Sequence, residues 1–149
     1  MKNLFTGVAT ALATPFNENG VNISEFKRFI NFQISSGVDA LVVCGTTGEA
    51  STMTKKEKID AITCAIEAVN SSTKKIPVIV GTGSNNTASS IEMSILAEKL
   101  GADGLLIVTP YYNKTTQLGL IEHFKAIAQS VSIPIILYNV PSRTGMNIE

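Results

Sequence analysis

The stretch ALVVCGTTGE, residues 40–49, joins a short apolar run to a turn in which two threonines lie between two glycines. Five consecutive apolar residues at 40–44 are typical of a buried strand. The flanking glycines let the backbone turn tightly at Thr46 and Thr47, close to a ligand. Two successive amide N–H groups and two hydroxyls can bind a small carboxylate without a charged residue. The stretch therefore predicts a strand that delivers a binding site.

Four other segments have the composition of strands: residues 5–15, 77–81, 104–108 and 134–139. Most of them are continuous apolar runs, as expected for parallel strands that are covered on both faces. Apolar residues at helical spacing fill the intervals between the strands. Strands that alternate with helices in this way indicate βαβ units and a parallel sheet.

Four helices are predicted, and each should turn one apolar face toward the sheet. The first has Ser24 as its expected N-cap, the second begins with a capping box at residues 54–57, and the third runs from about Thr87 to Gly101. The expected inward residues are Phe26, Phe29, Ile30 and Ile34; Ile59, Ile62, Ile66 and Val69; Ile91, Ile95 and Leu96; and, on the fourth helix, Ile121, Phe124, Ala128 and Val131.

Small and hydroxyl residues follow four of the strands in recognisable motifs, whereas the loops that precede the strands, such as residues 71–75 and 130–132, contain serines and lysines in no such motif. This asymmetry favours a (β/α)8 TIM barrel, in which the active site lies at the carboxyl ends of the strands. A doubly wound open sheet would also bind ligands there and remains an alternative. Because a barrel takes about 250 residues, we expect residues 1–149 to be the N-terminal part of one barrel domain, with about five strands and four helices.

The composition excludes several classes of function. Lysine plus arginine and aspartate plus glutamate both number 12, so no basic surface indicates nucleic acid. No run approaches the ~20 apolar residues of a membrane span. Two cysteines indicate no disulfide framework and suit the cytoplasm, and threonines and Pro15 interrupt what loosely imitates a signal peptide. One histidine without a ligand cluster predicts no metal, and the motif at 81–86 lacks the third glycine of a dinucleotide site.

Three motifs resemble the dihydrodipicolinate synthase family, within the pyruvate-dependent class I aldolases that include N-acetylneuraminate lyase. They are GTTGE at 45–49, PYYNK at 110–114 and YNVPSRTG at 138–145, and the resemblance covers the whole chain. It implies a lyase without a cofactor that condenses pyruvate with aspartate semialdehyde in diaminopimelate and lysine biosynthesis. It also implies a homo-oligomer, either a dimer or a tetramer.

The resemblance assigns roles to five residues. Tyr138 would donate and accept protons, linked through Thr46 to Tyr112, which in the family reaches in from a neighbouring subunit. Thr47 would bind the carboxylate of pyruvate, and Arg143 the carboxylate of the semialdehyde. The chemistry is reasonable, because a hydroxyl both donates and accepts and a guanidinium binds a carboxylate in two places.

The sequence contains no candidate for the lysine nucleophile that the resemblance implies. The family forms a Schiff base on a lysine of the sixth strand, which would fall beyond Glu149, and none of the ten lysines here lies in a predicted strand. The chain alone is therefore expected to be inactive. A further departure is that Lys55, Lys58 and Ser89 stand where lysine-inhibited members carry histidines and a glutamate, which predicts no feedback by lysine.

Two other functions remain open. One is an aldolase or lyase that acts on a sugar acid, although Thr46 and Arg143 favour the synthase. The other is a non-catalytic half-barrel that is stable only when it pairs with another chain. Taken singly, the threonines could be turn formers, Tyr138 a core residue and Arg143 a surface charge.

Overall fold

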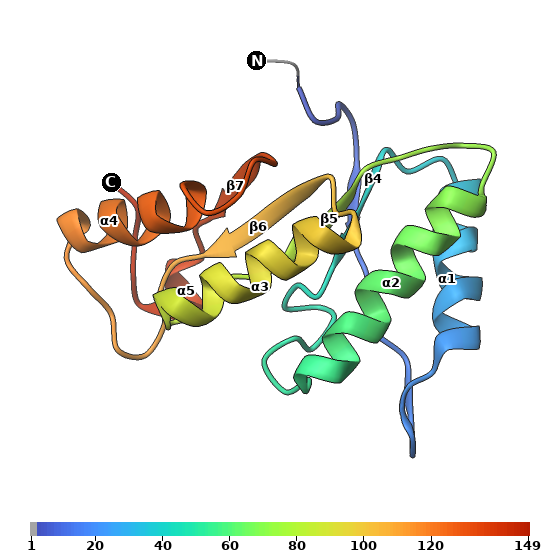
Figure 1. Ribbon diagram of the computed structural model, residues 1–149, viewed down its shortest axis with the longest axis horizontal. Helices are drawn as coiled ribbons and strands as arrows, with labels where there is room; N and C mark the ends of the chain where they lie inside the picture. Colours follow the sequence, from blue (N-terminus) through green and yellow to red (C-terminus); the bar gives the residue numbers. More distant parts are fainter. Residues whose placement is uncertain (1–2) are drawn as a thin grey trace.

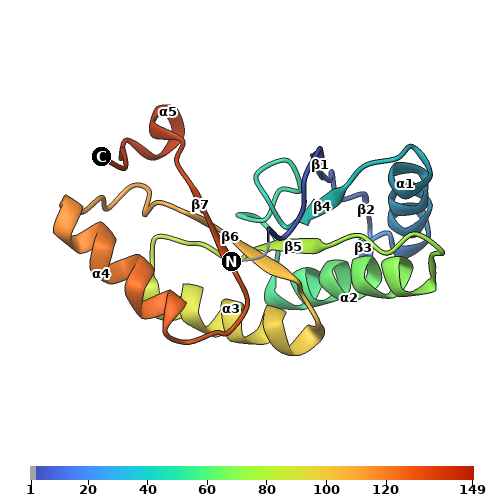
Figure 2. The same ribbon diagram turned by 90° about the horizontal axis from the view of Figure 1, so that it is seen from above.

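The main feature of the computed structural model, which describes residues 3–149, is a curved sheet of five parallel strands with helices on its outer side (Figures 1 and 2). Its elements are β1 (Ala9–Ala11), β2 (Phe16–Asn17), β3 (Gly20–Val21), α1 (Ile23–Ser35), β4 (Ala40–Val43), α2 (Lys55–Ser71), β5 (Val78–Gly81), α3 (Thr87–Leu100), β6 (Gly104–Val108), α4 (Gln117–Ala128), β7 (Ile135–Tyr138) and α5 (Pro141–Thr144).

The sheet has the order β1-β4-β5-β6-β7, so each strand pairs with the next one that the crossover helices deliver. Residues paired in register point to the same side of a sheet. Val43, Val80 and Leu105 are linked in this way, and all three are buried in the core under the helices. Val42, Ile79 and Tyr138 belong to the opposite, concave side. The fold therefore separates a helix-covered core from an inner face.

Helices α1 to α4 follow the outside of the curve in Figure 2, while α5 and the loop after β4 lie at the two ends of its open side. This is the arrangement of a β/α barrel, so the predicted fold class is confirmed. The sequence also located the strands, because β4 and β6 begin at residues 40 and 104 as expected.

The first strand is shorter than predicted. Only residues 9–11 of the expected 5–15 pair with β4, and the chain then forms a small antiparallel hairpin from β2 and β3. Pro15 and the turn residues that follow it account for the difference, because proline cannot donate to a ladder and the turn reverses the chain.

Two helix starts test the capping predictions. The box at the start of α2 is confirmed, since the Thr54 and Glu57 side chains each bond the other's backbone. The N-cap of α1 is Asn22 rather than Ser24, and the Asn22 side chain accepts from the Glu25 amide at 3.3 Å. Asparagine and serine cap about equally well, so the two candidates could not be separated by residue type.

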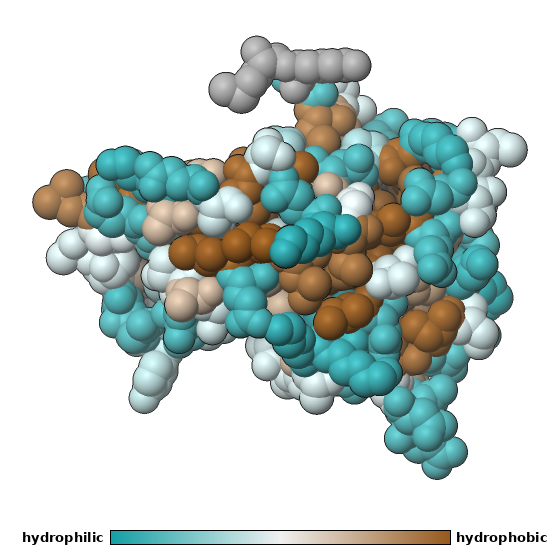
Figure 3. All heavy atoms as spheres, in the orientation of Figure 1, coloured by the Kyte–Doolittle hydropathy of each residue, from teal (hydrophilic) through white to brown (hydrophobic). Residues whose placement is uncertain are grey.

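Helix α3 faces the sheet with small residues, which the sequence did not predict. Its fully buried positions are Ser90, Ser94 and Ala97, whereas Ile95 and Leu96, expected to point inward, are only half-buried. Figure 3 shows apolar side chains gathered over α3 in the middle of this face. Because the buried serine hydroxyls find partners, with Ser94 Oγ 2.8 Å from Thr82 Oγ1, the helix can approach the sheet closely.

Helix α4 is also rotated relative to the prediction. It buries Leu120, His123 and Ile127, while Ile121, expected inside, is 57% exposed. His123 is tolerated because its Nδ1 lies 2.9 Å from the Thr87 hydroxyl, although its Nε2 has no partner among the described residues. The hydrogen bond to Thr87 therefore satisfies one nitrogen of the buried ring on the face of α4 that packs against the core.

On α2, Ile62 and Val69 are buried as predicted, but Ile59 and Ile66 are half-buried and alanines complete the contact.

Gly81 allows the ends of β4 and β5 to approach each other. A Cβ atom at this position would lie 2.2 Å from the Cys44 carbonyl oxygen. Gly83 has the same role toward β6, because its Cβ would lie 2.5 Å from the Val108 amide nitrogen. The glycines that imitate a dinucleotide motif in the sequence therefore serve strand packing.

We expect Gly81→Ala to lower the free energy of unfolding by about 1–3 kcal/mol, because the added methyl group displaces the backbone of β4. Gly45→Ala is the matched control, since its Cβ would meet only Val42, at 3.6 Å. Urea unfolding followed by circular dichroism measures both variants. Equal losses in the two would contradict this account of the strand ends.

Stability should fall as the pH drops from about 7.5 to about 5. Burial lowers the pKa of His123 below its ordinary 6.5, so below that pH the unfolded chain takes up a proton that the folded chain resists. His123 is the only histidine, so His123→Gln should remove this pH dependence in urea titrations. An unchanged slope in the variant would show that another group is responsible.

Candidate active site

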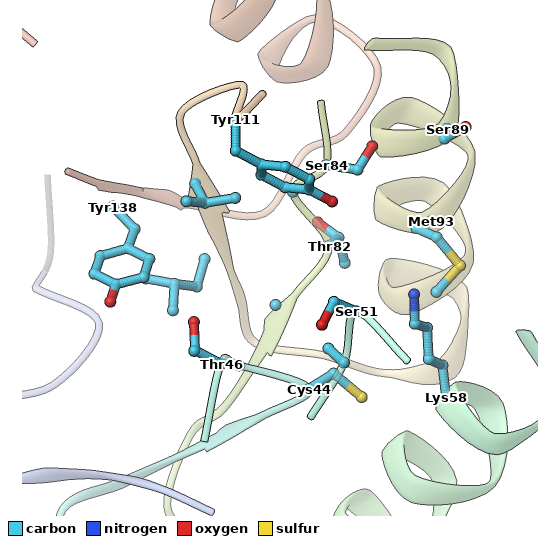
Figure 4. A pocket seen from close by; sticks show the side chains of 16 residues that line it. Cys44, Thr46, Ser51, Lys58, Thr82, Ser84, Ser89, Met93, Tyr111 and Tyr138 are labelled. Atoms are coloured by element: carbon cyan, nitrogen blue, oxygen red, sulfur yellow. The ribbon is translucent and has the colours of Figure 1, made fainter. Parts of the chain in front are cut away.

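A cavity of about 220 Å³ opens at the carboxyl ends of β4, β5, β6 and β7 (Figure 4). This is the edge at which the sequence predicts the active site. The lining residues are Cys44, Gly45, Thr46, Ala50, Ser51, Lys58, Gly81, Thr82, Gly83, Ser84, Ser89, Met93, Leu106, Val108, Tyr111 and Tyr138.

The turn after β4 forms one wall of the cavity. Two non-glycine residues with positive φ bracket it, Cys44 at 56° and Glu49 at 59°. Inside the turn, the amides of Gly48 and Glu49 donate to the carbonyls of Gly45 and Thr46, each at 3.1 Å. The turn is therefore tightly wound in a conformation that non-glycine residues rarely adopt.

The same turn leaves four donors free. Among the described residues, neither the amides nor the hydroxyls of Thr46 and Thr47 donate a hydrogen bond, and both residues are exposed. Adjacent amides and hydroxyls of this kind form a concavity suited to an anion. The binding of a carboxylate at this turn stays a prediction.

Tyr138 ends β7 on the concave side of the sheet, in register with Val108 of β6. It is half-buried, and its hydroxyl and that of Thr46 point into the same part of the cavity in Figure 4. The structure therefore brings together two of the five predicted site residues, although no hydrogen bond joins them in the part of the chain described.

Three predicted residues do not line the cavity. Thr47 lies beside Thr46 on the exposed turn, and Arg143 is exposed in the short helix α5. Tyr112 is 92% exposed with a positive φ of 68°, while its neighbour Tyr111 lines the cavity instead. Within one chain, these side chains are separate from the cavity, so their roles stay predictions.

Lys58 is a cavity residue that was not predicted as part of the catalytic or substrate-binding set. Its amino group points toward the cavity beside Met93 in Figure 4, and no aspartate or glutamate of the described residues lines the same space. The capping box could have indicated this position. It fixes the start of α2 after the loop that follows β4, so the first turn of α2, which carries Lys58, lies beside the ends of the strands. The cavity therefore carries a positive charge.

Cys44 lines the cavity, but its thiol is expected to have low nucleophilic reactivity. Burial raises the pKa of its thiol to about 12, and the nearby Lys58 ammonium offsets only part of this rise. Burial also raises the pKa of Cys64. Since the thiolate is the nucleophile of cysteine chemistry, neither residue is suited to covalent catalysis at neutral pH.

The opposite wall is held by a second set of hydrogen bonds. The Ser84 amide donates to Ser90 Oγ at 2.9 Å, which fixes the loop after β5 against α3. Asn113 Nδ2 donates to the Asn85 carbonyl at 3.1 Å and ties the tyrosine loop to the same place. Both loops are thereby anchored where they border the cavity.

Residues 3–149 contain no group of three or more histidine, cysteine or acidic side chains placed to hold a metal ion. None of the helices within that range is long and apolar enough to cross a membrane.

Folded protein should react only slowly with iodoacetamide at about pH 8, because a buried thiol with a raised pKa provides little thiolate. Mass spectrometry of peptides containing Cys44 and Cys64 would measure the labelling, with the same reaction in urea as the control. Labelling of Cys44 at equal rates in both conditions would contradict its burial.

The comparisons with known proteins agree with this geometry. The family described as "Dihydrodipicolinate synthetase family" matches residues 4–149. The 4-hydroxy-tetrahydrodipicolinate synthase 1 of Clostridium acetobutylicum is 60% identical over 98% of this chain and 49% of its own length. That of Acetivibrio thermocellus is 57% identical over 99% of the chain and 50% of its length.

Solved structures give the same result. The dihydrodipicolinate synthase of Thermotoga maritima superposes with a TM-score of 0.93 at 44% identity, over 98% of this chain and 48% of that one. The enzyme of Aquifex aeolicus gives 0.91 at 47% identity, over 97% and 48%. The chain therefore spans about half the length of the relatives it matches.

Proposed function

Because this chain belongs to the dihydrodipicolinate synthetase family, we propose that it supplies the N-terminal half of a barrel that condenses pyruvate with aspartate semialdehyde. The product would be 4-hydroxy-tetrahydrodipicolinate, on the route to diaminopimelate and lysine. The enzyme would be a lyase that acts through a lysine Schiff base. The names of the relatives support this reaction over the sugar-acid alternative.

The free donors of Thr46 and Thr47 are the observation that carries the proposal. Two amides and two hydroxyls without partners in the described chain lie on this turn, of which Thr46 lines the cavity and Thr47 lies beside it, and a carboxylate accepts from such groups. We assign the carboxylate of pyruvate to this turn, with Thr47 as its main side-chain ligand. The tight turn keeps the donors together before the substrate arrives, which lowers the entropic cost of binding.

The charge of the cavity supports an anionic substrate. Lys58 lines it, forms none of the four ion pairs found in the described chain, and has no acidic neighbour in the lining. A cleft of one charge raises the local concentration of ligands of opposite charge. Pyruvate and the semialdehyde both carry a carboxylate, so this charge would favour both.

Tyr138 is the proposed proton donor and acceptor. The ordinary pKa of a tyrosine is about 10, so proton transfer near neutral pH requires a partner that receives or returns the proton. Thr46 is suited to this, because its hydroxyl both donates and accepts and shares the cavity with Tyr138.

Tyr112 would complete this relay in a neighbouring subunit. It is almost fully exposed, and α4 beside it exposes Leu118 by 75% and Ile121 by 57%. Large exposed apolar side chains near one another are typical of protein–protein contacts. These features support a homo-oligomer, either a dimer or a tetramer. In it, the Tyr112 side chain would extend into the active site of the neighbouring subunit.

Arg143 is the proposed ligand for the carboxylate of the semialdehyde. It lies in α5, directly after β7, and forms no ion pair in the described chain, so its planar fork is available for bidentate binding.

We assign the Schiff-base lysine to the part of the barrel outside this chain. None of the lysines in residues 3–149 lies in a strand. The two free cysteines agree with a reducing compartment, and we assign the enzyme to the cytoplasm.

The reaction can be tested by fusing this chain to the half of the Clostridium acetobutylicum relative that it does not match. We expect the fusion to consume pyruvate and aspartate semialdehyde, and Tyr138→Phe to lower kcat about a hundredfold or more, because the proton carrier is removed. Circular dichroism of the variant controls for folding. Activity of Tyr138→Phe near that of the unaltered fusion would refute the role of Tyr138.

Reduction with borohydride in the presence of pyruvate locates the nucleophile. Peptide mapping should find the adduct on a lysine outside residues 1–149 in the fusion and none on the chain alone. The peptide that contains Lys58 is the most informative one, because Lys58 lines the cavity and is therefore the alternative nucleophile. An adduct there would contradict the assigned nucleophile.

A further inference from the structure

Thr14 is a buried residue between β1 and β2, and its hydroxyl acts on the substrate-binding turn. Only 5% of the residue is exposed. Its Oγ1 donates to the carbonyl oxygen of Gly48 at 2.9 Å, across 34 residues of sequence. Gly48 directly follows Thr47, so this bond reaches the turn next to the proposed carboxylate ligand.

No other side chain outside residues 44–52 donates to the backbone of residues 45–49 in the described part of the chain. The remaining bonds of the turn are local, from Gly48, Glu49, Ala50 and Thr52. Among the described residues, the Thr14 bond is therefore the one side-chain hydrogen bond that joins the turn to the segment after β1.

The turn has a reason to need such a contact. Cys44 and Glu49 hold positive φ angles, and a non-glycine residue keeps such a conformation only when its surroundings stabilise it. Without an anchor, the segment between them can relax toward ordinary backbone angles. The donors of Thr46 and Thr47 would then change their positions relative to one another.

The contact is also closely packed. A Cβ atom on Gly48 would lie 3.0 Å from Thr14 Oγ1 and 3.0 Å from the Leu12 carbonyl oxygen. The Leu12 amide in turn donates to the Val42 carbonyl at 2.9 Å, which extends the pairing of β1 with β4. The turn thus rests on a segment that the sheet itself holds in place.

We propose that Thr14 is a positioning residue, whose hydroxyl holds the turn at residues 45–49 in the conformation that presents the donors of Thr46 and Thr47 to a carboxylate. The second part of this inference rests on the proposed function. The chemistry that Thr14 supports is recognition of the carboxylate of an α-keto acid, and Thr14 does not touch the substrate itself.

Three substitutions separate the hydroxyl from the packing. Thr14→Val keeps the shape and removes the donor, Thr14→Ser keeps the donor and removes a methyl group, and Thr14→Ala removes both. Thr109→Val is the matched control, because Thr109 is also buried but its hydroxyl has no partner in the described chain. If Thr14→Val fails to fold, the comparison of Thr14→Ala with Thr14→Ser carries the test.

Amide hydrogen exchange measured by NMR on the 149-residue chain tests the first part. We expect the Gly48 and Glu49 amides to exchange about tenfold faster in Thr14→Val and Thr14→Ala, as the loss of one buried hydrogen bond implies. The serine variant and Thr109→Val should match the unaltered chain, and amides of α4 should not change. Unchanged exchange at the turn in the valine and alanine variants would overturn the proposal.

Titration with pyruvate of the fusion described under the proposed function, carrying the same substitutions, tests the second part. The dissociation constant should rise about tenfold in Thr14→Val, and in Thr14→Ser it should equal that of the unaltered fusion. If the unaltered fusion binds pyruvate and Thr14→Val binds it equally well, the positioning role is wrong. If the unaltered fusion does not bind pyruvate but exchange accelerates as expected, the positioning of the turn stands and the assigned carboxylate site fails.

Discussion

The arrangement of this molecule depends on how closely the carboxyl ends of its parallel strands approach one another. Gly81 lies against the Cys44 carbonyl, and Gly83 against the backbone at the end of β6, in spaces that admit no Cβ atom. Because the strands can converge there, the loops that follow them share one cavity. A wider spacing would separate the tyrosine of β7 from the threonine turn of β4, and the two would no longer line one cavity.

The cavity combines two kinds of support. Its donors lie on loops, but each loop is held by a bond from a neighbouring element: Thr14 fixes the turn after β4, Ser90 fixes the loop after β5, and Asn113 ties the tyrosine loop to Asn85. Loops border the cavity while the sheet keeps them in place, and in this class of fold such loops usually carry the functional residues. Lys58 adds a positive charge to the lining of this cavity.

The sequence was informative wherever a pattern was local. Continuous apolar runs located the strands, and the capping box at Thr54 located the start of α2. The sequence was less informative about how each helix is rotated about its own axis, and so about which face it turns toward the sheet. On α3 the small residues Ser90 and Ser94 face the sheet because Thr82 and Ser84 satisfy their hydroxyls, and on α4 His123 is buried because Thr87 bonds it. These partners lie on other elements, so helical spacing alone could not reveal them.

By itself, then, the sequence determined the order of strands and helices, the parallel sheet, the edge at which polar groups gather and the motifs that place the chain in its family. These follow from local apolar spacing and from residue types at the ends of strands. The tertiary structure decided which groups meet. It joined Thr46 and Tyr138 in one cavity and added Lys58. It left Thr47, Tyr112 and Arg143 outside the cavity, and it placed the Thr14 hydroxyl against the threonine turn. The physical reason is that hydrogen bonds and close packing between segments distant in sequence depend on distances that no local pattern encodes.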